Sequence, residues 1–236
     1  MIKFFLTLCL CCLGIVIAPL VLLTSNNFQR VIIKYWSRAV LASLAIQIDC
    51  DSNLEKILKH DNFLVIANHV SWLDIVAINA LNPVSFVAKS EIKFWPLINF
   101  LAMTAKTIFI NRKEPSDVKK IVPFLSKQLN YKSICIFPEG TSTDGFSVEL
   151  FKSNLFQVAI DANKMILPLA ISYYQKNVKT KAASYYGDMN LLESIYSVIR
   201  NENILVLKTE SLSGSAPPLV DCIFTTVNSD VLFWVI

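Results

Sequence analysis

The first part of the chain is a long apolar run without charge. No charged residue occurs from Phe4 to Gln29, and the stretch from Phe4 to Leu23 alone gives 20 mostly apolar residues. At a rise of about 1.5 Å per residue, a helix of that length spans roughly the 30 Å hydrocarbon core of a bilayer. A cleaved signal peptide is the alternative, but its apolar core is typically about 7 to 15 residues long and ends at a small-x-small site. Here Pro19 follows Ala18 and no good cleavage site occurs, so the pattern predicts an N-terminal hydrophobic helical membrane anchor.

Basic residues follow this run at every fourth position. Arg30, Lys34 and Arg38 would form one stripe on a helix whose neighbouring positions are mainly apolar and aromatic. One interpretation is an interfacial helix whose cations reach lipid headgroups, and the other is an amphipathic helix packed on a globular domain. Because Lys3 stands alone before the apolar run and three cations follow it, the positive-inside rule places the rest of the chain on the cytoplasmic face of the membrane.

Beyond about residue 49 the pattern changes to short apolar runs that alternate with longer helical periods, which is typical of α/β folds. The runs that predict strands are 63–67, 85–88, 107–110, 133–137, 166–172 and 204–208. The segments that predict helices are 71–80, 96–105, 115–130, 154–162 and 191–199. We therefore expect an α/β domain over 49–218 with a mixed sheet flanked by helices. The membrane helix and the basic helix occupy 1–48, and an apolar tail of unknown role follows at 219–236.

Composition narrows the function classes. Charged residues make up 17% of the 236, against about 25% in an average soluble domain, and 54% are hydrophobic. Five glycines and two histidines are too few for a dinucleotide-binding fingerprint or a His-rich metal site. The net charge of +4 is small and dispersed, which argues against a nucleic-acid partner and suits an anionic lipid surface better. The six cysteines lack zinc-ligand spacing, so we interpret them as reduced thiols of a protein that faces the cytosol.

The segment 68–74, with the sequence NHVSWLD, follows a predicted strand and contains His69 and Asp74. Five residues on a regular helix turn through about 500°, so these two side chains can meet only if a loop folds His69 back. The carboxylate could then accept from one ring nitrogen and leave the other free as a general base, as in a Ser-His-Asp triad without its serine. Such a pair suits the activation of a hydroxyl that the substrate brings. The alternative is a capping box, in which Ser71 caps the helix and Asp74 merely reaches back.

A second polar segment, 137–145 with the sequence FPEGTSTDG, follows another apolar run. Gly140 and Gly145 have the outer spacing of a phosphate-binding loop, but Phe146 stands where its lysine belongs, which argues against a nucleotide loop. What remains is a polar turn at the carboxyl end of a strand, where open α/β sheets usually place ligands.

Two cations also follow predicted strands. Arg112 ends the apolar run 108–110 after one asparagine, and its planar guanidinium suits bidentate recognition of a phosphate. Lys89 follows the run 85–88. Each of the two could instead be an ordinary solvated residue at the end of a strand.

Together these segments resemble the 1-acylglycerol-3-phosphate acyltransferase family of glycerolipid enzymes, in content and in order, over about residues 63–218. The stretch from Asn68 to Asp74 looks like the family's catalytic N-H-x-x-x-x-D motif. The segments 109–112, 137–142 and 166–170 look like its second block, its F-P-E-G-T-[RS] block and its proline-bearing fourth block. Four motifs in sequence are a specific signal, although any one of them is weak.

The resemblance implies a glycerol-phosphate acyltransferase-like fold and a membrane-bound O-acyltransferase. His69, poised by Asp74, would deprotonate the hydroxyl of a lysolipid, which would attack the thioester of acyl-CoA or an acyl carrier protein. The acceptor would be 1-acylglycerol-3-phosphate and the product phosphatidic acid, without a metal or redox cofactor. The resemblance assigns the phosphate end of the acceptor to Arg112 and to the turn of Glu139, Gly140 and Thr141. It places Lys89 near the developing oxyanion.

Other functions remain open at this level. The segments 143–145 and 186–192 are also similar to the branch of the family that acylates lyso-ornithine lipids. A catalytically silent lipid-binding membrane protein is the alternative of a different class. A lipid hydrolase is disfavoured because no G-x-S-x-G elbow occurs. Two features depart from the family: Lys106 stands where it often has glycine, and the tail at 219–236 is apolar.

Overall fold

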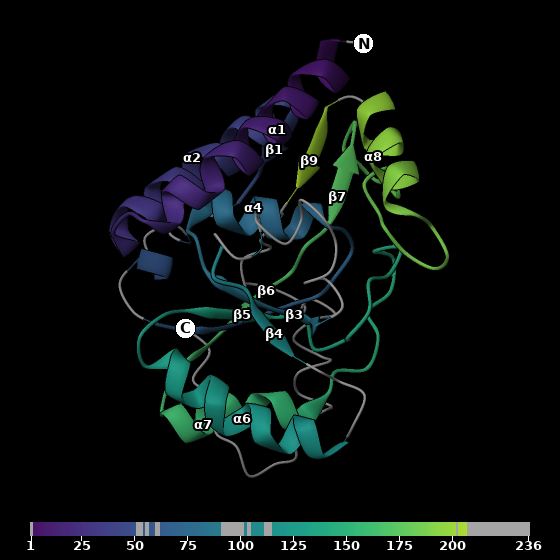
Figure 1. The fold of residues 1–236 in the computed structure, drawn as a ribbon. Helices are drawn as coiled ribbons and strands as arrows, with labels where there is room; N and C mark the ends of the chain where they lie inside the picture. The colour runs from purple at the N-terminus through teal and green to yellow at the C-terminus, as the bar shows by residue number, and fades with distance from the viewer. Residues whose placement is uncertain are drawn as a thin grey trace.

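The central sheet of the protein is built from the apolar runs of the sequence, as the computed structural model in Figure 1 shows. The structure describes residues 2–50, 54, 57–59, 62–90, 102, 105–110, 115–201 and 203–206. Five parallel strands run in the order β4-β3-β5-β2-β6, and they are β2 (Leu64–Ala67), β3 (Ser85–Lys89), β4 (Ile108–Ile110), β5 (Ile134–Ile136) and β6 (Ile166–Leu169). This order follows from helical crossovers, because parallel neighbours cannot be joined by a short hairpin.

Helices cover both faces of this sheet. One face carries α4 (Leu73–Leu81), and the other carries α6 (Pro115–Leu129) and α7 (Gln157–Ala162), which the 3-10 turn η2 (Ser153–Phe156) precedes (Figure 1). A cluster of buried apolar side chains fills each interface.

Alternate side chains along a strand pack into the two clusters in turn. In β2, Val65 and Ala67 belong to the cluster on the α4 side, while Leu64 and Ile66 belong to the cluster under α6 and α7. Because both faces are covered, every residue of β2 is buried. Two-sided burial is the reason that the strands appear in the sequence as continuous apolar runs.

A second sheet of four strands lies beside α8 (Leu191–Arg200) (Figure 1). Its order is β1-β9-β7-β8, with the bounds β1 (Ile46–Ile48), β9 (Ile204–Val206), β7 (Tyr173–Gln175) and β8 (Val178–Lys179). β1 pairs with β9 in parallel, whereas β7 is antiparallel to both of its neighbours. The second sheet therefore pairs a strand that precedes the whole parallel sheet with the last described residues of the chain.

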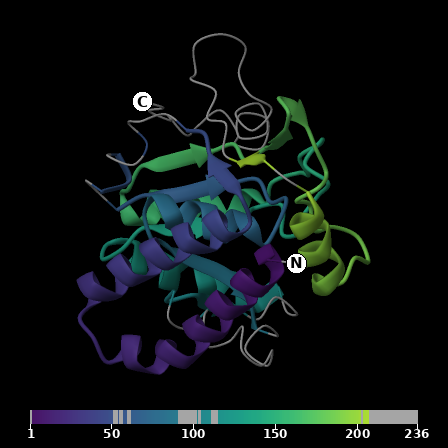
Figure 2. The same cartoon turned by 90° about the horizontal axis from the view of Figure 1, so that it is seen from above.

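At the N-terminus, α1 (Ile2–Leu22) and α2 (Asn26–Ser43) form a helical hairpin on the α4 side of the domain (Figures 1 and 2). The helices approach closely at Gly14, where an added Cβ would lie 2.8 Å from the indole nitrogen of Trp36. That nitrogen donates to the carbonyl of Leu10 at 3.1 Å. Most other positions of α1 are apolar and only 22% of its most apolar window is buried. Among the described residues, α1 is the one helix long and apolar enough to cross a membrane.

The basic stripe of α2 contacts the C-terminal end of α4. Arg30 donates to Oδ1 of Asn82 at 3.1 Å, and Nε of Arg38 donates to the carbonyl of Ala80 at 2.9 Å. Cations are favourable at a helix C-terminus because the last carbonyl groups lack partners within the helix. Of the two interpretations of the stripe, the structure shows the helix packed on the domain. A contact of the same helix with lipid headgroups stays a prediction.

The α/β class, with sheets flanked by helices, is confirmed. The predicted strand at 166–172 is wrong in extent, because β6 ends at Leu169 and β7 begins at Tyr173 in the other sheet. The short strands β1, β7 and β8 were not predicted. Most of the predicted helix at 96–105, and the whole tail at 219–236, lie outside the described residues.

Candidate active site

The candidate site lies at the carboxyl edge of the parallel sheet, between β2 and β5. These strands are neighbours, and the helices that follow them, α4 and α7, cover opposite faces of the sheet (Figure 1). Open α/β sheets bind their ligands at such a topological switch point. The segment after β2 contains His69 and the segment after β5 contains Glu139, so the fold brings the two predicted polar segments to one place.

His69 and Asp74 form a hydrogen-bonded pair. Nδ1 of His69 lies 2.8 Å from Oδ2 of Asp74, which is fully buried, while the histidine side chain keeps 22% of its surface exposed. His69 is in the loop before α4 and Asp74 in its first turn, as the motif spacing requires. The same oxygen accepts from the backbone N–H groups of Val70 and Ser71, at 2.8 and 2.9 Å. The carboxylate therefore orients the imidazole and also binds the backbone at the start of α4. Its contact with the N–H of Ser71 is one of the two hydrogen bonds of the alternative capping box.

Tyr173 completes the surroundings of the carboxylate and was missed by the sequence reasoning. Its hydroxyl donates to Oδ1 of Asp74 at 2.6 Å, and the side chain is 1% exposed. Burial, and next the charge of Asp74, raise the pKa of Tyr173 well above its ordinary value, so the hydroxyl stays a donor. The two residues are 99 positions apart, and no motif in the sequence joins them.

Aromatic packing fixes the plane of the imidazole. The ring of Phe137, directly after β5, is stacked on His69 with centroids 4.1 Å apart and planes 14° from parallel. Phe86 of β3 lies behind Phe137 at a centroid distance of 6.1 Å. One nitrogen of the ring is held by Asp74 and one face by Phe137, which leaves Nε2 for a substrate.

Glu139 connects two loops through its carboxylate. Oε1 accepts from the backbone N–H of His69 at 2.6 Å, and Oε2 accepts from that of Glu149 at 2.8 Å. The side chain is buried, and this burial raises the pKa of Glu139, although the two backbone hydrogen bonds act in the opposite direction. Glu139 thus holds the main chain of His69 in position. A direct contact between Glu139 and an acceptor stays a prediction.

Asn68 explains why the predicted strand 166–172 is interrupted. Its side chain accepts from the backbone N–H of Ile171 at 2.7 Å and donates to the carbonyl of Ile171 at 2.9 Å. Both backbone groups of Ile171 are thereby bound by a side chain instead of a neighbouring strand. The chain can then leave the parallel sheet after Leu169 and bring Tyr173 to Asp74.

Two later loops bind the backbone around His69. The N–H of Thr143 donates to the carbonyl of His69 at 2.9 Å, and that of Tyr185 donates to Val70 at 2.8 Å. These loops contain the segments 143–145 and 186–192, which carried the fainter similarity to the lyso-ornithine branch. The structure therefore places both of these loops beside the histidine.

An ion pair lies on the same two loops. Nζ of Lys181 is 2.7 Å from Oδ2 of Asp144, with 52% and 23% of the side chains exposed. The hydrogen bond from Lys181 lowers the pKa of Asp144, and the same bond raises the pKa of Lys181. Phe146 lies beneath the ammonium group, whose nitrogen is 5.2 Å from the ring centroid.

Comparison with known proteins agrees with this geometry. The family model described as Acyltransferase matches residues 50–172, which is just over half of the chain and includes both loops at the switch point. The chain belongs to the acyltransferase family. It is 36% identical over 171 residues to a 1-acyl-sn-glycerol-3-phosphate acyltransferase of Neisseria meningitidis, covering 72% of this chain and 66% of that one. It is 35% identical over 170 residues to a lyso-ornithine lipid O-acyltransferase of Pseudomonas aeruginosa, covering 72% and 64%.

The similarity spans slightly less than two thirds of the length of these curated relatives. A solved structure supports the fold: that of the 1-acyl-sn-glycerophosphate acyltransferase PlsC from Thermotoga maritima has a TM-score of 0.56. It is 22% identical in sequence, and the match covers 74% of this chain and 75% of that one. The acyltransferase fold expected from the sequence is therefore confirmed.

Several residues predicted for this acyltransferase site stay predictions. Gly140 has φ +75° and shapes the turn after Glu139, while the side chain of Thr141 is exposed. Lys89 is the exposed last residue of β3, at the same edge of the sheet as His69. Arg112 lies outside the described residues.

The departure at Lys106 has a structural explanation. Lys106 lies in a turn before β4 with φ +54°, a backbone conformation that favours glycine. The glycine expected here from the sequence resemblance would adopt this conformation without strain, and in this chain Lys106 adopts it.

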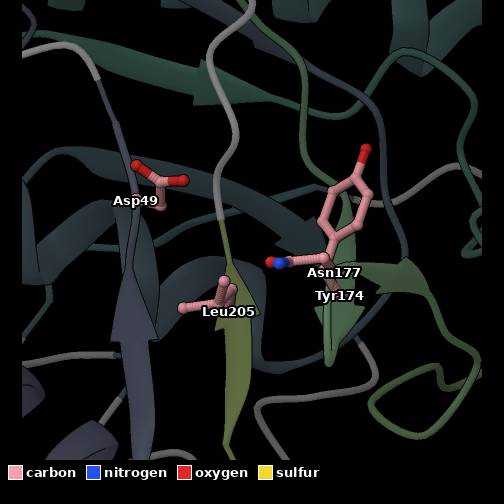
Figure 3. Close-up of a pocket in the computed structure, with 4 residues that line it drawn as sticks. All are labelled: Asp49, Tyr174, Asn177 and Leu205. Atoms are coloured by element: carbon pink, nitrogen blue, oxygen red, sulfur yellow. The ribbon is translucent and has the colours of Figure 1, made fainter.

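A small pocket in the second sheet is separate from this site. Its volume is about 110 Å³, and Asp49, Tyr174, Asn177 and Leu205 line it (Figure 3). Successive side chains of a strand point to opposite faces, so Tyr174 is directed away from the face on which its neighbour Tyr173 reaches Asp74. Neither His69 nor Asp74 lines this pocket.

Proposed function

We propose that the protein is a membrane-bound acyltransferase that moves a fatty acyl group from a thioester to the free hydroxyl of a lysolipid. The observation that carries this proposal is the His69 imidazole, oriented by the buried Asp74 carboxylate at the switch point of the sheet. The names of the curated relatives, which act on lysophosphatidic acid or lyso-ornithine lipid, support the same reaction class.

In the proposed reaction His69 acts as general base. With the Nδ1 proton shared with Asp74, Nε2 carries the lone pair that takes the hydroxyl proton of the acceptor. The hydroxyl oxygen attacks the thioester carbonyl, the C–S bond breaks, and the imidazolium returns the proton to the leaving thiolate. The acceptor supplies the nucleophile, so no serine is needed. Only an acyl group and a proton move, so the proposal includes no metal or redox cofactor.

Rigidity around His69 supports catalysis rather than passive binding. Asp74, Phe137 and Glu139 fix the ring's nitrogen, its face and its backbone, respectively. General bases work best when their geometry is set before the substrate arrives. A catalytically silent lipid-binding protein would not require this support.

A hydrolase that uses a cysteine is also disfavoured. Cys135 lies in β5, two residues before Phe137, and it is fully buried. Burial, and next the charge of Asp74, raise the pKa of the Cys135 thiol well above its ordinary value. A neutral, inaccessible thiol is a poor nucleophile.

For the acceptor we propose 1-acylglycerol-3-phosphate, which would give phosphatidic acid. Arg112 and the turn of Glu139, Gly140 and Thr141 would lie at its phosphate end, with Lys89 near the developing oxyanion. Acyl-CoA or an acyl carrier protein would supply the acyl group.

Lyso-ornithine lipid is the second candidate acceptor, and one observation favours it. Its headgroup carries both an amine and a carboxylate. The partly exposed pair of Asp144 and Lys181, on loops bound to the His69 segment, offers one charge of each sign. A zwitterionic headgroup could exchange partners with this pair.

We further propose that α1 anchors the protein in a membrane with the catalytic domain on the cytoplasmic face. Its length and its exposed apolar surface support the anchor. The cations that follow it support the orientation.

The proposed function is tested by a thioester-consumption assay on the purified full chain. Acyl-CoA and acyl carrier protein donors are combined with lysophosphatidic acid, lyso-ornithine lipid and lysophosphatidylcholine, and products are identified by mass spectrometry. We expect acceptor-dependent release of free thiol and a two-chain lipid product. Thiol release at the same rate without any lysolipid would indicate hydrolysis, and no release with any pair would favour the silent lipid-binding protein.

A further inference from the structure

Three cations come together at the edge of the parallel sheet opposite to His69. Lys106 and Lys132 lie two residues before β4 and β5. Arg30 of α2 donates to Asn82, which lies three residues before β3. β4, β3 and β5 are adjacent in the sheet, so the three cations start from neighbouring positions at its amino edge.

A hydrogen bond ties one of these cations, Lys106, to the start of α2, the helix that contains Arg30. Nζ of Lys106 donates to Oδ1 of Asn26, the first residue of that helix. Asn26 and Arg30 are four residues apart and lie on one helix face. In the described part of the chain, Arg30, Lys106 and Lys132 bind no carboxylate.

The electrostatics of this cluster are unfavourable without a counter-ion. Burial lowers the pKa of Arg30, Lys106 and Lys132, with a further lowering of Lys106 by Arg30 and of Lys132 by Lys106. The N-terminus of α2 adds the positive end of a helix dipole, and the first turn of α2 contains no acidic residue. A lysine at a helix N-terminus has the wrong sign for that dipole. An oxyanion would reverse each of these repulsions at once.

We propose that Arg30, Lys106 and Lys132 form a binding site for the phosphate of a membrane phospholipid. The tip of the α1–α2 hairpin lies beside this cluster and exposes apolar side chains, with Leu23 at 84% and Phe28 at 53% exposure. Apolar groups next to an oxyanion site match a lipid, whose phosphate is joined to hydrocarbon. This site lies at the opposite edge of the sheet from the acceptor site. It rests on the membrane location proposed above, and not on the acyl transfer.

The test measures the thermal unfolding of the detergent-solubilised full chain in the presence of three probes. These are dihexanoylphosphatidylglycerol, inorganic phosphate, and sodium chloride at matched ionic strength. At about a hundred times its dissociation constant, a ligand of the folded state is expected to raise Tm by roughly 5–10 °C in a chain of this size. We expect this rise with the phosphatidylglycerol and not with sodium chloride.

A triple variant and a matched control make the test specific. The variant is Arg30→Gln, Lys106→Asn and Lys132→Gln, where asparagine is chosen because it tolerates the left-handed backbone of residue 106. The control removes three positive charges away from this edge of the sheet, at Lys152, which precedes η2, and at Lys176 and Lys179, which follow β7 and end β8 in the second sheet. We expect the triple variant to bind the phosphatidylglycerol at least tenfold more weakly, and the control to respond like wild type. The triple variant also loses the hydrogen bonds of Arg30 and Lys106, so each response to a ligand is measured from the ligand-free Tm of the same variant.

Each remaining outcome overturns part of the proposal. An equal response of wild type and the triple variant would place the lipid elsewhere, and no response of the wild type would remove the site. If inorganic phosphate stabilised the wild type as strongly as the lipid did, and this effect were lost in the triple variant, the cluster would bind free phosphate and the lipid assignment would be wrong. A Lys132→Gln single variant serves as a further check should the triple variant fold poorly. Acyl transfer is not measured, so failure here leaves the proposed function untouched.

Discussion

Tyr173→Phe removes one hydrogen bond from the buried Asp74 carboxylate and leaves its other contacts in place. The change removes one hydroxyl, whose hydrogen bond to Oδ1 of Asp74 is 2.6 Å long, and leaves the buried ring in place. Oδ2 of Asp74 keeps its three partners, the His69 ring and two backbone N–H groups. A lost hydrogen bond to a buried charged group is worth about 1.5 to 3 kcal/mol. At roughly 2 to 4 °C per kcal/mol for a chain of this size, Tm should fall by about 3 to 12 °C.

Loss of the Tyr173 hydrogen bond should also lower kcat, but by less than the whole energy of that bond would predict. If all of that energy supported the transition state, kcat would fall by roughly 10 to 150-fold. Because three donors still hold Oδ2, we expect the lower end, about tenfold, with little change in the KM of the acyl donor. The assays are thermal unfolding and thioester consumption. Tyr131→Phe makes the same chemical change at a side chain that is 76% exposed, and it should alter neither value. Unchanged Tm and kcat in Tyr173→Phe would refute the reasoning.

Three further substitutions test other parts of the site. Glu139→Gln replaces one of the two carboxylate oxygens that accept backbone N–H groups by an NH2 group, which cannot accept. The free energy of unfolding, measured by urea titration at pH 7, should therefore fall by about 1 to 3 kcal/mol. Because burial raises the pKa of Glu139 above 4.5, the wild type should lose stability as pH rises just above that value, and the variant should lack this slope. Gly145→Ala places a Cβ 3.0 Å from Val70 at φ +83°, so both Tm and kcat should fall; a normal Tm would disprove the close packing. Arg112→Lys should weaken the use of lysophosphatidic acid by about tenfold or more without changing the KM of the acyl donor, because lysine lacks the bidentate fork. Equal activity of that variant would remove Arg112 from the site.

The hydrogen-bonded pair of His69 and Asp74 could be predicted because it is local. His69 and Asp74 are five residues apart, and both the loop and the first helical turn that join them follow from the segment itself. The apolar runs that became the parallel strands were also visible, because burial on both faces leaves a continuous apolar signature.

The surroundings of the pair could not be predicted, because they depend on contacts between distant segments. Tyr173 reaches Asp74 only because Asn68 binds Ile171 and interrupts the predicted strand. β1 is three residues long and becomes a strand only by pairing with β9 near the end of the described chain. Short elements of this kind carry too little periodicity to be recognised locally.

The polar contacts of α2 could not be predicted from the sequence either. A stripe of cations on a helix has the same spacing whether it meets lipid headgroups or a neighbouring helix. In this fold the stripe meets a neighbouring helix, because Asn82 and Ala80 at the C-terminal end of α4 accept hydrogen bonds from Arg30 and Arg38. Sequence spacing defines a face of a helix, and only the tertiary structure says what covers it.

The central claim, that His69 is the general base of an acyl transfer to a lysolipid, is tested most directly by His69→Ala. Thioester consumption and acceptor binding are measured on the same preparation of the full chain, with folding checked by thermal unfolding. General-base catalysis contributes about 10² to 10⁴ in rate, so the account predicts a loss of that size with acceptor affinity nearly unchanged. Turnover within about threefold of wild type, in a variant that folds normally, would contradict it.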